Sequence, residues 1–442
     1  MKSISIYIHI PFCVKKCQYC DFLSAPADSR AQEVYLRALK QEIREQAARY
    51  REYEVQTVFI GGGTPTAVPC ENLCEVLKTV FSFYRMNPHA EISMEANPGT
   101  VTKEALLSYR KAGINRISIG LQSADDMELK LLGRIHTYRD FQQTYRWAQE
   151  AGFTNINLDI MSALPGQSVE NYKKTLETVL SLNPQHISAY SLIVEEGTPF
   201  YEKYGQESEK LQATGEKQPD LPSEEEEREM YALTEKLLAA AGYHRYEISN
   251  YALPGRECRH NLVYWKRGNY VGFGLGAASM VENVRFENIR EMQEYLAEYA
   301  GMPDAEPVFA EVAQGDAQVL SNEQELSLRE DTHSENEQEL SLREDTHSEN
   351  EQELSIRENV HPLSPQEQME ETMFLGLRLT EGVSKAEFHR QFGVSMEQIY
   401  GEVIRKNTAK GLLIDEAGYV CLTREGMDLS NYVMAQFLLD EV

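Results

Sequence analysis

Three cysteines stand close together near the start of the chain, in the stretch YIHIPFCVKKCQYCDF (residues 7–22). Cys13, Cys17 and Cys20 have the spacing C-x3-C-x2-C. Thiolates spaced in this way bind either a zinc ion, completed by a distant ligand such as His9, or three corners of a [4Fe–4S] cluster. In a cluster the fourth iron is open to a ligand from outside the chain. The spacing alone leaves both chemistries open.

Polar residues also lie at the ends of several predicted β-strands. The sequence GGGTPT (61–66) ends one strand, and Glu95, Gln122 and Asp159 lie at or near the ends of three others. Active sites of (β/α) barrels form at the carboxyl ends of the strands, so we expect these residues to meet the cysteine loop there. GGGTPT lacks the lysine of a phosphate-binding P-loop. Its glycines instead predict close approach of the backbone to a ligand, with Glu95 nearby.

The segments that position these residues alternate between strand and helix patterns from residue 4 to about residue 250. The β-rich runs lie at 4–10, 55–63, 91–97, 116–123, 155–163 and 186–194. Amphipathic helical segments, such as 31–50 and 102–113, separate them. Repeated strand–helix units predict a parallel sheet in an α/β fold. Six such units in residues 1–250 predict a full or partial (β/α) barrel.

Three further regions follow the predicted barrel. Residues 251–310 hold a motif region and a helical connection. Residues 311–363 contain NEQELSLREDTHSE twice and then a diverged copy, NEQELSIRENVHPL. This acidic repeat predicts a solvated, disordered insertion, to which we assign no chemistry. Residues 364–442 predict three helices followed by a β-hairpin, which is typical of a mainly helical, winged-helix-like domain.

The composition excludes several functional classes. The formal net charge is −27 and the pI is about 4.9, which argues against a nucleic-acid-binding surface. No apolar run reaches the ~18 residues of a membrane-spanning helix, and the N-terminus lacks the pattern of a secretory signal. We therefore expect a cytoplasmic protein without an integral membrane segment, whose cysteines are thiols or metal ligands.

The motifs taken together resemble a known family. YIHIPFCVKKCQYCDF, GGGTPT and MEANPGT, followed in order by GLQS, LLGRIHT and NLDIM, closely resemble radical S-adenosylmethionine (SAM) proteins. More narrowly, they resemble the group around the oxygen-independent coproporphyrinogen III oxidase. The resemblance implies a partial (β/α)6-type radical SAM barrel, followed by the C-terminal winged-helix-like domain.

The resemblance also assigns residues to cofactors. It implies that Cys13, Cys17 and Cys20 ligate a [4Fe–4S] cluster whose open iron is chelated by the amino and carboxylate groups of SAM. The residues that fall where the family contacts SAM are Tyr7, Tyr19, Gly62, Gly63, Thr64, Glu95, Gln122, Arg134 and Asp159. In this family an electron from the reduced cluster breaks a C–S bond of SAM and releases a 5′-deoxyadenosyl radical, while the protein orients the cofactor.

Two features distinguish the two functional classes within this family. The oxidases resembled here carry a further cysteine two residues after the third, where this chain has Phe22. The sequence RHNLVYW (259–265) matches the H-N-x-x-Y-W motif of the heme chaperone branch. That match implies that His260 ligates heme iron. The remaining heme residues that it implies are Asn261, Tyr264 and Trp265.

The leading hypothesis is therefore a heme chaperone that binds heme, a [4Fe–4S] cluster and SAM, and that transfers heme to membrane-associated respiratory enzymes. The alternative is an enzyme, the oxygen-independent coproporphyrinogen III oxidase, which oxidatively decarboxylates two propionates to form protoporphyrinogen IX. The expected partners are heme or porphyrin, respiratory enzymes that receive heme, an electron donor for the cluster and a second copy in a homodimer. The expected location is the cytoplasm, with peripheral contact to the membrane. We assign no catalytic residue from the sequence.

Overall fold

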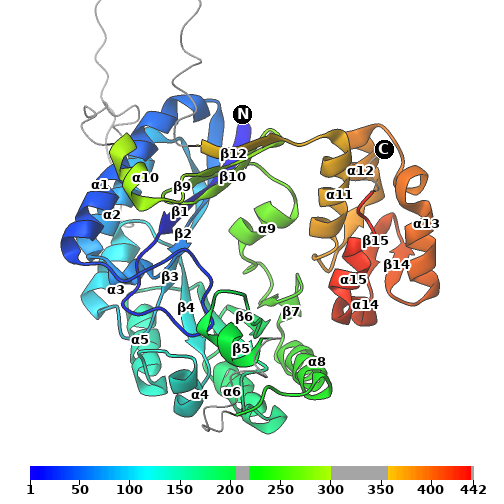
Figure 1. The fold of residues 1–442 in the computed structure, drawn as a ribbon, viewed down its shortest axis with the longest axis horizontal. Coiled ribbons are helices and arrows are strands. Elements are labelled where there is room, and N and C mark those ends of the chain that lie inside the picture. Colours follow the sequence, from blue (N-terminus) through cyan, green and yellow to red (C-terminus); the bar gives the residue numbers. More distant parts are fainter. Residues whose placement is uncertain (206–218, 300–356, 440–442) are drawn as a thin grey trace, which may run out of the picture.

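The computed structural model describes residues 1–205, 219–299 and 357–439. Their strands form a twelve-stranded sheet, in the order β12-β11-β10-β9-β1-β2-β3-β4-β5-β6-β8-β7, and a small sheet in the order β13-β15-β14 (Figure 1). Six neighbouring parallel strands form the centre of the large sheet: β1 (Lys2–Ile10), β2 (Tyr53–Gly62), β3 (Met86–Ala96), β4 (Arg116–Gln122), β5 (Ile156–Ser162) and β6 (His186–Ser191). The two edge strands of this order do not pair with each other, so the barrel is partial, as expected from the sequence.

Helices connect the parallel strands and cover the outer face of the sheet (Figure 1). They are α1 (Ser29–Gln46), α2 (Cys70–Phe83), α3 (Lys103–Lys111), α4 (Asp126–Leu131), α5 (Tyr138–Glu150), α6 (Val169–Ser181), α7 (Pro199–Tyr204) and α8 (Glu224–Ala240), with 3-10 turns η1 (Ala47–Tyr50) and η2 (Pro65–Ala67). Polar N-caps begin several of them: the side chains of Asp28, Thr102 and Ser168 each accept a backbone N–H of the first turn. Among the described residues, no helix has the length and apolar character needed to cross a membrane.

Alternation along the parallel strands separates a packing face from a cavity face. In β1, Ile6 and Ile8 are fully buried in the main hydrophobic core, whereas Tyr7 between them lines a cavity. In β5, Leu158 belongs to the same core and its neighbour Asp159 lines the cavity. Successive side chains of a strand point to opposite faces, so the apolar residues attach the helices while the polar ones face inward. This periodicity places the functional residues.

A second group of elements extends the sheet beyond β1 and β6. It consists of β7 (His244–Arg245), β8 (Asn250–Ala252), α9 (Arg259–Trp265), β9 (Tyr270–Phe273), β10 (Ala278–Val281), β11 (Val284–Asn288), α10 (Met292–Glu298) and β12 (Arg357–Pro362). β9 pairs in parallel with β1, and β12 pairs antiparallel with β11. The sequence placed residues 357–362 in the disordered insertion, but they form strand β12. Leu363, the last residue of the predicted insertion, is buried. The remaining residues of that insertion, 311–356, lie outside the described residues.

The C-terminal region has its own hydrophobic core, which includes Met373, Phe388 and Tyr400. Its elements are α11 (Pro365–Gly376), β13 (Val383–Ser384), α12 (Lys385–Phe392), α13 (Met396–Ala409), β14 (Leu413–Glu416), β15 (Tyr419–Leu422), α14 (Arg424–Asp428) and α15 (Ser430–Ala435). Ala417 and Gly418, both at positive φ, form the predicted hairpin turn. The helices followed by this hairpin agree with the expected mainly helical, winged-helix-like domain.

Candidate functional site

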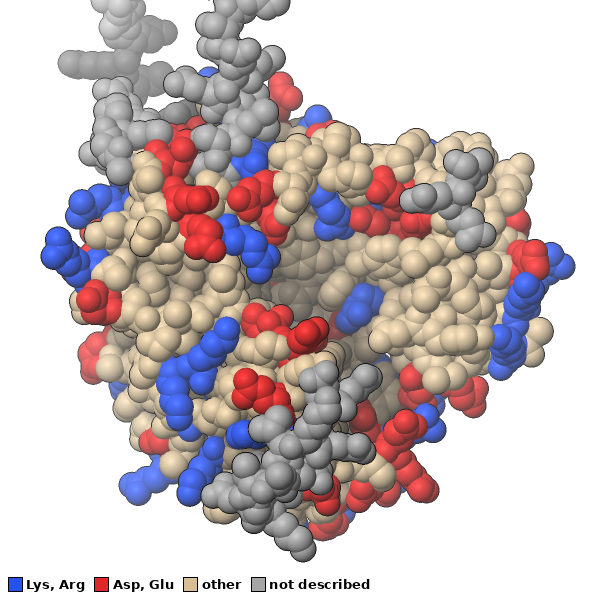
Figure 2. Space-filling view, viewed as in Figure 1, with Lys and Arg blue, Asp and Glu red and all other residues tan. Residues whose placement is uncertain are grey.

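A cavity of about 590 Å³ runs along the inner face of the parallel strands. Figure 2 shows this side of the molecule hollowed between the sheet and the C-terminal domain. All residues that the sequence assigned to the cluster and to SAM line this cavity, together with His260, Asn261 and Tyr264 of the heme set. The structure thus brings together residues that are spread over more than 250 positions of the sequence.

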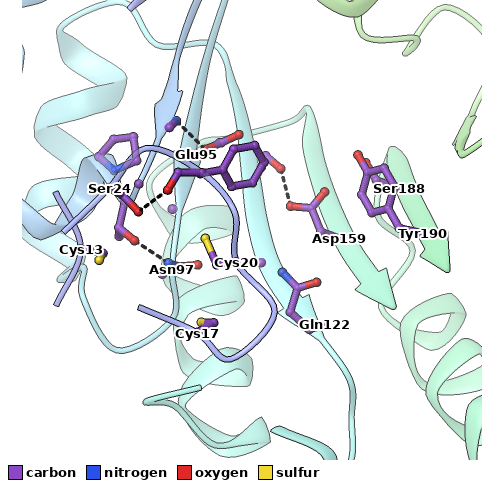
Figure 3. A pocket seen from close by; sticks show the side chains of 18 of the residues that line it. Cys13, Cys17, Cys20, Ser24, Glu95, Asn97, Gln122, Asp159, Ser188 and Tyr190 are labelled. Carbon is purple, nitrogen blue, oxygen red and sulfur yellow. Dashed lines mark hydrogen bonds between the residues drawn. The ribbon is translucent and has the colours of Figure 1, made fainter. Parts of the chain in front are cut away.

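The loop after β1 carries the three thiols at one side of the cavity (Figure 3). Its path is fixed by the backbone, because Cys13 N–H donates to the Ala25 carbonyl at 3.2 Å. Burial raises the pKa of the Cys13 and Cys20 thiols. These thiols therefore need a metal or a nearby cation to exist as thiolates at neutral pH.

The cysteine loop offers three thiols, the ligand set of an iron–sulfur cluster with one open iron. In the described part of the chain, no three His, Cys, Asp or Glu side chains converge on the position of a single metal ion. His9 is engaged elsewhere: its Nδ1 lies 3.0 Å from Tyr7 Oη and its Nε2 lies 2.9 Å from the Leu23 carbonyl. A cluster needs no such convergence, since each thiolate binds a different iron. The donor set therefore fits a [4Fe–4S] cluster.

Arg134 is a fixed cation beside the thiols. Its Nη1 lies 3.7 Å from Cys17 Sγ, and its Nη2 donates to Asn97 Oδ1 at 2.6 Å and to the Gly120 carbonyl at 2.9 Å. Asn97 in turn donates through Nδ2 to Thr64 Oγ1 at 2.7 Å. A held guanidinium offsets the negative charge of thiolates in a buried site. Asn97 was missed from the sequence, although its place directly after the third strand was a signal.

The glycines of GGGTPT serve the packing of the cysteine loop. A Cβ at Gly63 would lie 2.5 Å from the Phe12 carbonyl oxygen, and one at Gly62, whose φ is +111°, would lie 2.6 Å from the His9 ring. Only glycine permits this approach and this backbone conformation. The end of β2 therefore lies directly against the loop that carries the thiols. Gly62 N–H also donates to Glu95 Oε2 at 3.2 Å.

Two carboxyl groups face the interior of the cavity, as Figure 3 shows. Burial, and then the nearby Asp159, raise the pKa of Glu95 to about 8. Burial likewise raises the pKa of Asp159, which accepts hydrogen bonds from Ser118 Oγ at 2.9 Å and Asn157 Nδ2 at 2.8 Å. Glu95 is thus largely protonated at neutral pH in the free chain. A cationic ligand placed beside it would lower that pKa and bind the carboxylate form.

Three other SAM residues complete the inner wall. Burial raises the pKa of the Tyr7 and Tyr19 phenols, so both are neutral. Gln122 ends β4 at a φ of +68°, a left-handed conformation that is uncommon outside glycine. Sequence reasoning missed further residues of this wall: Phe59, Arg116, Ser118, Asn157, Ser188 and Tyr190. Most occupy alternate positions earlier in the same strands, and this periodicity could have identified them.

His260 lies on α9, is 1% exposed, and has both ring nitrogens engaged. Its Nδ1 lies 2.7 Å from Thr57 Oγ1, and its Nε2 lies 2.8 Å from Tyr264 Oη. Thr57 donates its hydroxyl proton to Ser5, so it accepts from Nδ1–H, and Nε2 accepts the proton of Tyr264. Burial, and then Arg116, lower the pKa of His260 to about 3. The imidazole is therefore neutral, which is the form that ligates iron.

Trp265 does not join the other heme residues. It lies outside the cavity, and the Arg378 guanidinium stacks on its ring at 4.3 Å. Glu91 fixes the start of α9 by accepting the backbone N–H groups of Arg259 and His260 at 3.1 and 3.2 Å. With α9 fixed in this way, Trp265 faces the C-terminal domain.

Comparisons with known proteins agree with this architecture. Residues 7–179 match the model of the Radical SAM superfamily, and residues 363–429 match the HemN C-terminal domain. Coproporphyrinogen III oxidase (HemN) from Escherichia coli superposes with a TM-score of 0.74 over 99% of this chain and 90% of that chain, at 21% identity. At this identity the match shows a shared fold.

Similarity to curated relatives extends over most or all of the chain. Heme chaperone HemW of Bacillus subtilis is 35% identical over 98% of this chain and 99% of that protein. Heme chaperone HemW of Lactococcus lactis is 32% identical over 100% of this chain and 99% of that protein. Heme chaperone HemW of Escherichia coli is 40% identical over 64% of this chain and 71% of that protein.

Proposed function

The chain belongs to the heme chaperone family of the radical SAM superfamily, and from this premise we propose that it binds heme and delivers it to another protein. One observation carries the proposal: identity of 32–35% to two heme chaperones over nearly the whole length of both chains. The alternative, decarboxylation of coproporphyrinogen III, is not favoured. The solved oxidase shares the fold at 21% identity, and this chain has Phe22 where the resemblance to the oxidases implies an additional cysteine.

Membership of the superfamily implies a [4Fe–4S] cluster and SAM. In our proposal Cys13, Cys17 and Cys20 hold the cluster, and Arg134 offsets their charge. Glu95 is the carboxylate that receives a cationic group of SAM, and the remaining SAM residues are those predicted from the sequence. When bound and reduced, the cluster supplies electrons for cleavage of SAM. The contribution of the chain is to hold and orient both groups in the cavity.

For heme we propose His260 as an iron ligand, together with Asn261 and Tyr264. The neutral ring of His260 and its place on the cavity wall support this role. Its Nε2 must first be released by Tyr264 before it can bind iron. Trp265 is removed from the proposed contacts, because it lies outside the cavity.

Further parts of the proposal concern partners, location and domain limits. We propose that respiratory enzymes receive the heme, that an electron donor reduces the cluster and that the chain forms a homodimer. We also propose a cytoplasmic location with peripheral contact to the membrane. The proposed domains are 1–250 for the barrel, 251–310 for the motif region, 311–356 for the insertion, now ended before strand β12, and 364–442 for the C-terminal domain.

The deciding experiment compares heme transfer with porphyrinogen decarboxylation. The chain is reconstituted anaerobically with iron and sulfide, loaded with hemin and mixed with a heme-free cytochrome, whose absorbance reports transfer. A parallel sample receives coproporphyrinogen III, SAM and a reductant. We expect heme transfer and little protoporphyrinogen IX. Efficient decarboxylation without heme transfer would refute the proposal. A Cys13→Ala variant should lose the cluster, whereas the matched Cys74→Ala variant on α2 should keep it.

A further inference from the structure

Large apolar side chains stand exposed at the opening of the cavity. Phe22 is 66% exposed and Ile193 is 68% exposed, although both line the cavity. Tyr190, which also lines it, is 40% exposed. Phe22 lies on the cysteine loop after β1, whereas Tyr190 and Ile193 lie at and just beyond the end of β6. Figure 3 shows the cysteine loop and Tyr190 on opposite sides of the cavity. Exposed apolar groups around an opening are typical of a ligand-binding surface.

Two cations share this opening. Lys15 and Lys16 are exposed and line the cavity. Neither forms an ion pair or a hydrogen bond with any residue that the structure describes. Among the residues that the structure describes, the acidic side chains that line the cavity are Glu95 and Asp159, and both face its interior. In a chain with a net charge of −27, these two exposed ammonium groups favour an anionic ligand at the opening, although Lys16 also lies near the Cys13 and Cys20 thiols.

We propose that Lys15, Lys16, Phe22, Tyr190 and Ile193, together called the rim, hold the macrocycle of heme. The flat porphyrin packs against Phe22, Tyr190 and Ile193, and its two propionate carboxylates pair with the two lysines. This inference rests on the proposed function and adds a surface that recognises the porphyrin rather than its iron. The occupant follows from complementarity: heme is a large apolar plate that carries two carboxylates at one edge.

The interior of the cavity and its opening offer separate places for SAM and for the porphyrin. A volume of about 590 Å³ lies within the range that a single ligand of moderate size occupies. The interior carries the residues assigned to SAM. A heme on the rim leaves this interior to the cofactor and keeps one edge of the porphyrin accessible to a recipient protein. This heme is not yet ligated by His260, which is buried on the cavity wall. The rim therefore separates recognition of the porphyrin from the chemistry of the interior.

The test uses the full-length, cluster-loaded chain and two porphyrins, hemin and iron-free protoporphyrin IX. Binding is followed by quenching of protein fluorescence and by absorbance. Phe22→Ala should weaken both porphyrins about tenfold, which corresponds to about 1.4 kcal/mol. Ile193→Ala should weaken both about threefold. The double variant Lys15→Glu/Lys16→Glu should weaken both at least about tenfold. Because it replaces attraction by repulsion, its affinity should rise with ionic strength, whereas that of the unmodified chain should fall.

Matched control variants make the same kinds of substitution at exposed positions outside the rim. Met127→Ala removes an apolar side chain that is 72% exposed on α4, and Lys111→Glu/Lys174→Glu reverses two exposed lysines on outer helices. Both controls should bind the two porphyrins as the unmodified chain does. Iron and sulfide content shows whether each variant retains the cluster. Ile193→Ala, which lies away from the cysteine loop, decides the matter if Phe22→Ala loses the cluster.

Wild-type affinity in the rim variants, with the cluster retained, would overturn the proposal. So would a loss confined to hemin, because the rim is proposed to contact the porphyrin and not its iron. An equal loss in the control variants would also count against it, since the effect would then be nonspecific. Failure of the unmodified chain to bind either porphyrin would refute the proposed function itself. If the unmodified chain binds both porphyrins and the rim variants bind them equally well, only the role of the rim is refuted.

Discussion

The hydrogen bond between Tyr264 and His260 makes a quantitative prediction about heme binding. In the structure Tyr264 Oη occupies Nε2 of His260 at 2.8 Å, and Thr57 occupies Nδ1 at 2.7 Å. Iron can bind Nε2 only after the phenol leaves. A Tyr264→Phe variant removes this competitor and keeps the ring that packs against Tyr270 at 4.7 Å. Hemin should therefore bind more tightly to the variant.

The size of the gain follows from the cost of one hydrogen bond. A typical intramolecular hydrogen bond contributes about 0.5–1.5 kcal/mol net. Removing the bond from the free state should thus raise hemin affinity about two- to tenfold. Iron-free protoporphyrin IX should bind the variant and the wild type equally, since it has no metal to ligate. Because the pKa of His260 is lowered to about 3, its ring stays neutral from pH 5 to 8, and its ligation should show no titration in that range.

The assay is an anaerobic absorbance titration with hemin, carried out on four chains: wild type, Tyr264→Phe, His260→Ala and the double variant. The gain should vanish when His260 is absent, and the visible bands of an imidazole-ligated heme should vanish with it. A gain that persists in the His260→Ala background would refute the reasoning, because the phenol would then act elsewhere. Weaker hemin binding by Tyr264→Phe would refute it as well, and would mean that the Tyr264 hydroxyl, and not only its ring, contacts the heme.

Three other residues give separate predictions. Asn97→Ala should weaken SAM binding about tenfold by calorimetry with the cluster retained, because it frees the Arg134 guanidinium that Asn97 holds at 2.6 Å; unchanged affinity would contradict this. Burial raises the pKa of Glu42 to about 7, so its folded state binds a proton more tightly than the unfolded chain does. Stability should therefore fall by about 3 kcal/mol as the pH rises from 5 to 8, and Glu42→Gln should flatten this dependence of the urea midpoint. Glu371→Ala leaves the nearly buried Arg267 guanidinium, 3.1 Å from its carboxylate, without that partner and should cost about 3–5 kcal/mol. Limited proteolysis should then release the C-terminal domain faster than in an exposed control, Glu387→Ala.

The strand pattern was enough to predict the parallel sheet and the meeting of distant residues. In β1 the alternation of Ile6, Tyr7 and Ile8 already assigns one face to the core and one to the cavity. The inner wall was only partly predicted, because attention to strand ends missed Arg116 and Ser118, which lie earlier in β4 on the same face. The alternation of side chains along a strand can be read from neighbouring residues in the sequence. How far along each strand the cavity extends depends instead on the curvature of the whole sheet.

Two other differences have local causes. The motif RHNLVYW was treated as one heme-binding unit, but it forms the helix α9. On a helix, positions four apart share a face, so His260 and Tyr264 meet while Trp265 turns away. The end of the third acidic repeat was assigned to the insertion by its composition. Its residues 357–362 instead complete the edge of the sheet, because pairing with β11 provides a contact that composition does not reveal.

The cysteine loop has a consequence for how the protein matures. Backbone bonds of the chain itself anchor this loop: Thr64 N–H donates to the Phe12 carbonyl at 2.7 Å, and Gln18 N–H donates to the Leu132 carbonyl at 3.0 Å. None of these bonds needs a metal, unlike those small metal-binding domains that are unfolded without their ion. We therefore expect the polypeptide to fold before it receives iron and sulfide. Cluster assembly would then be a late step, at a pocket whose walls are already formed.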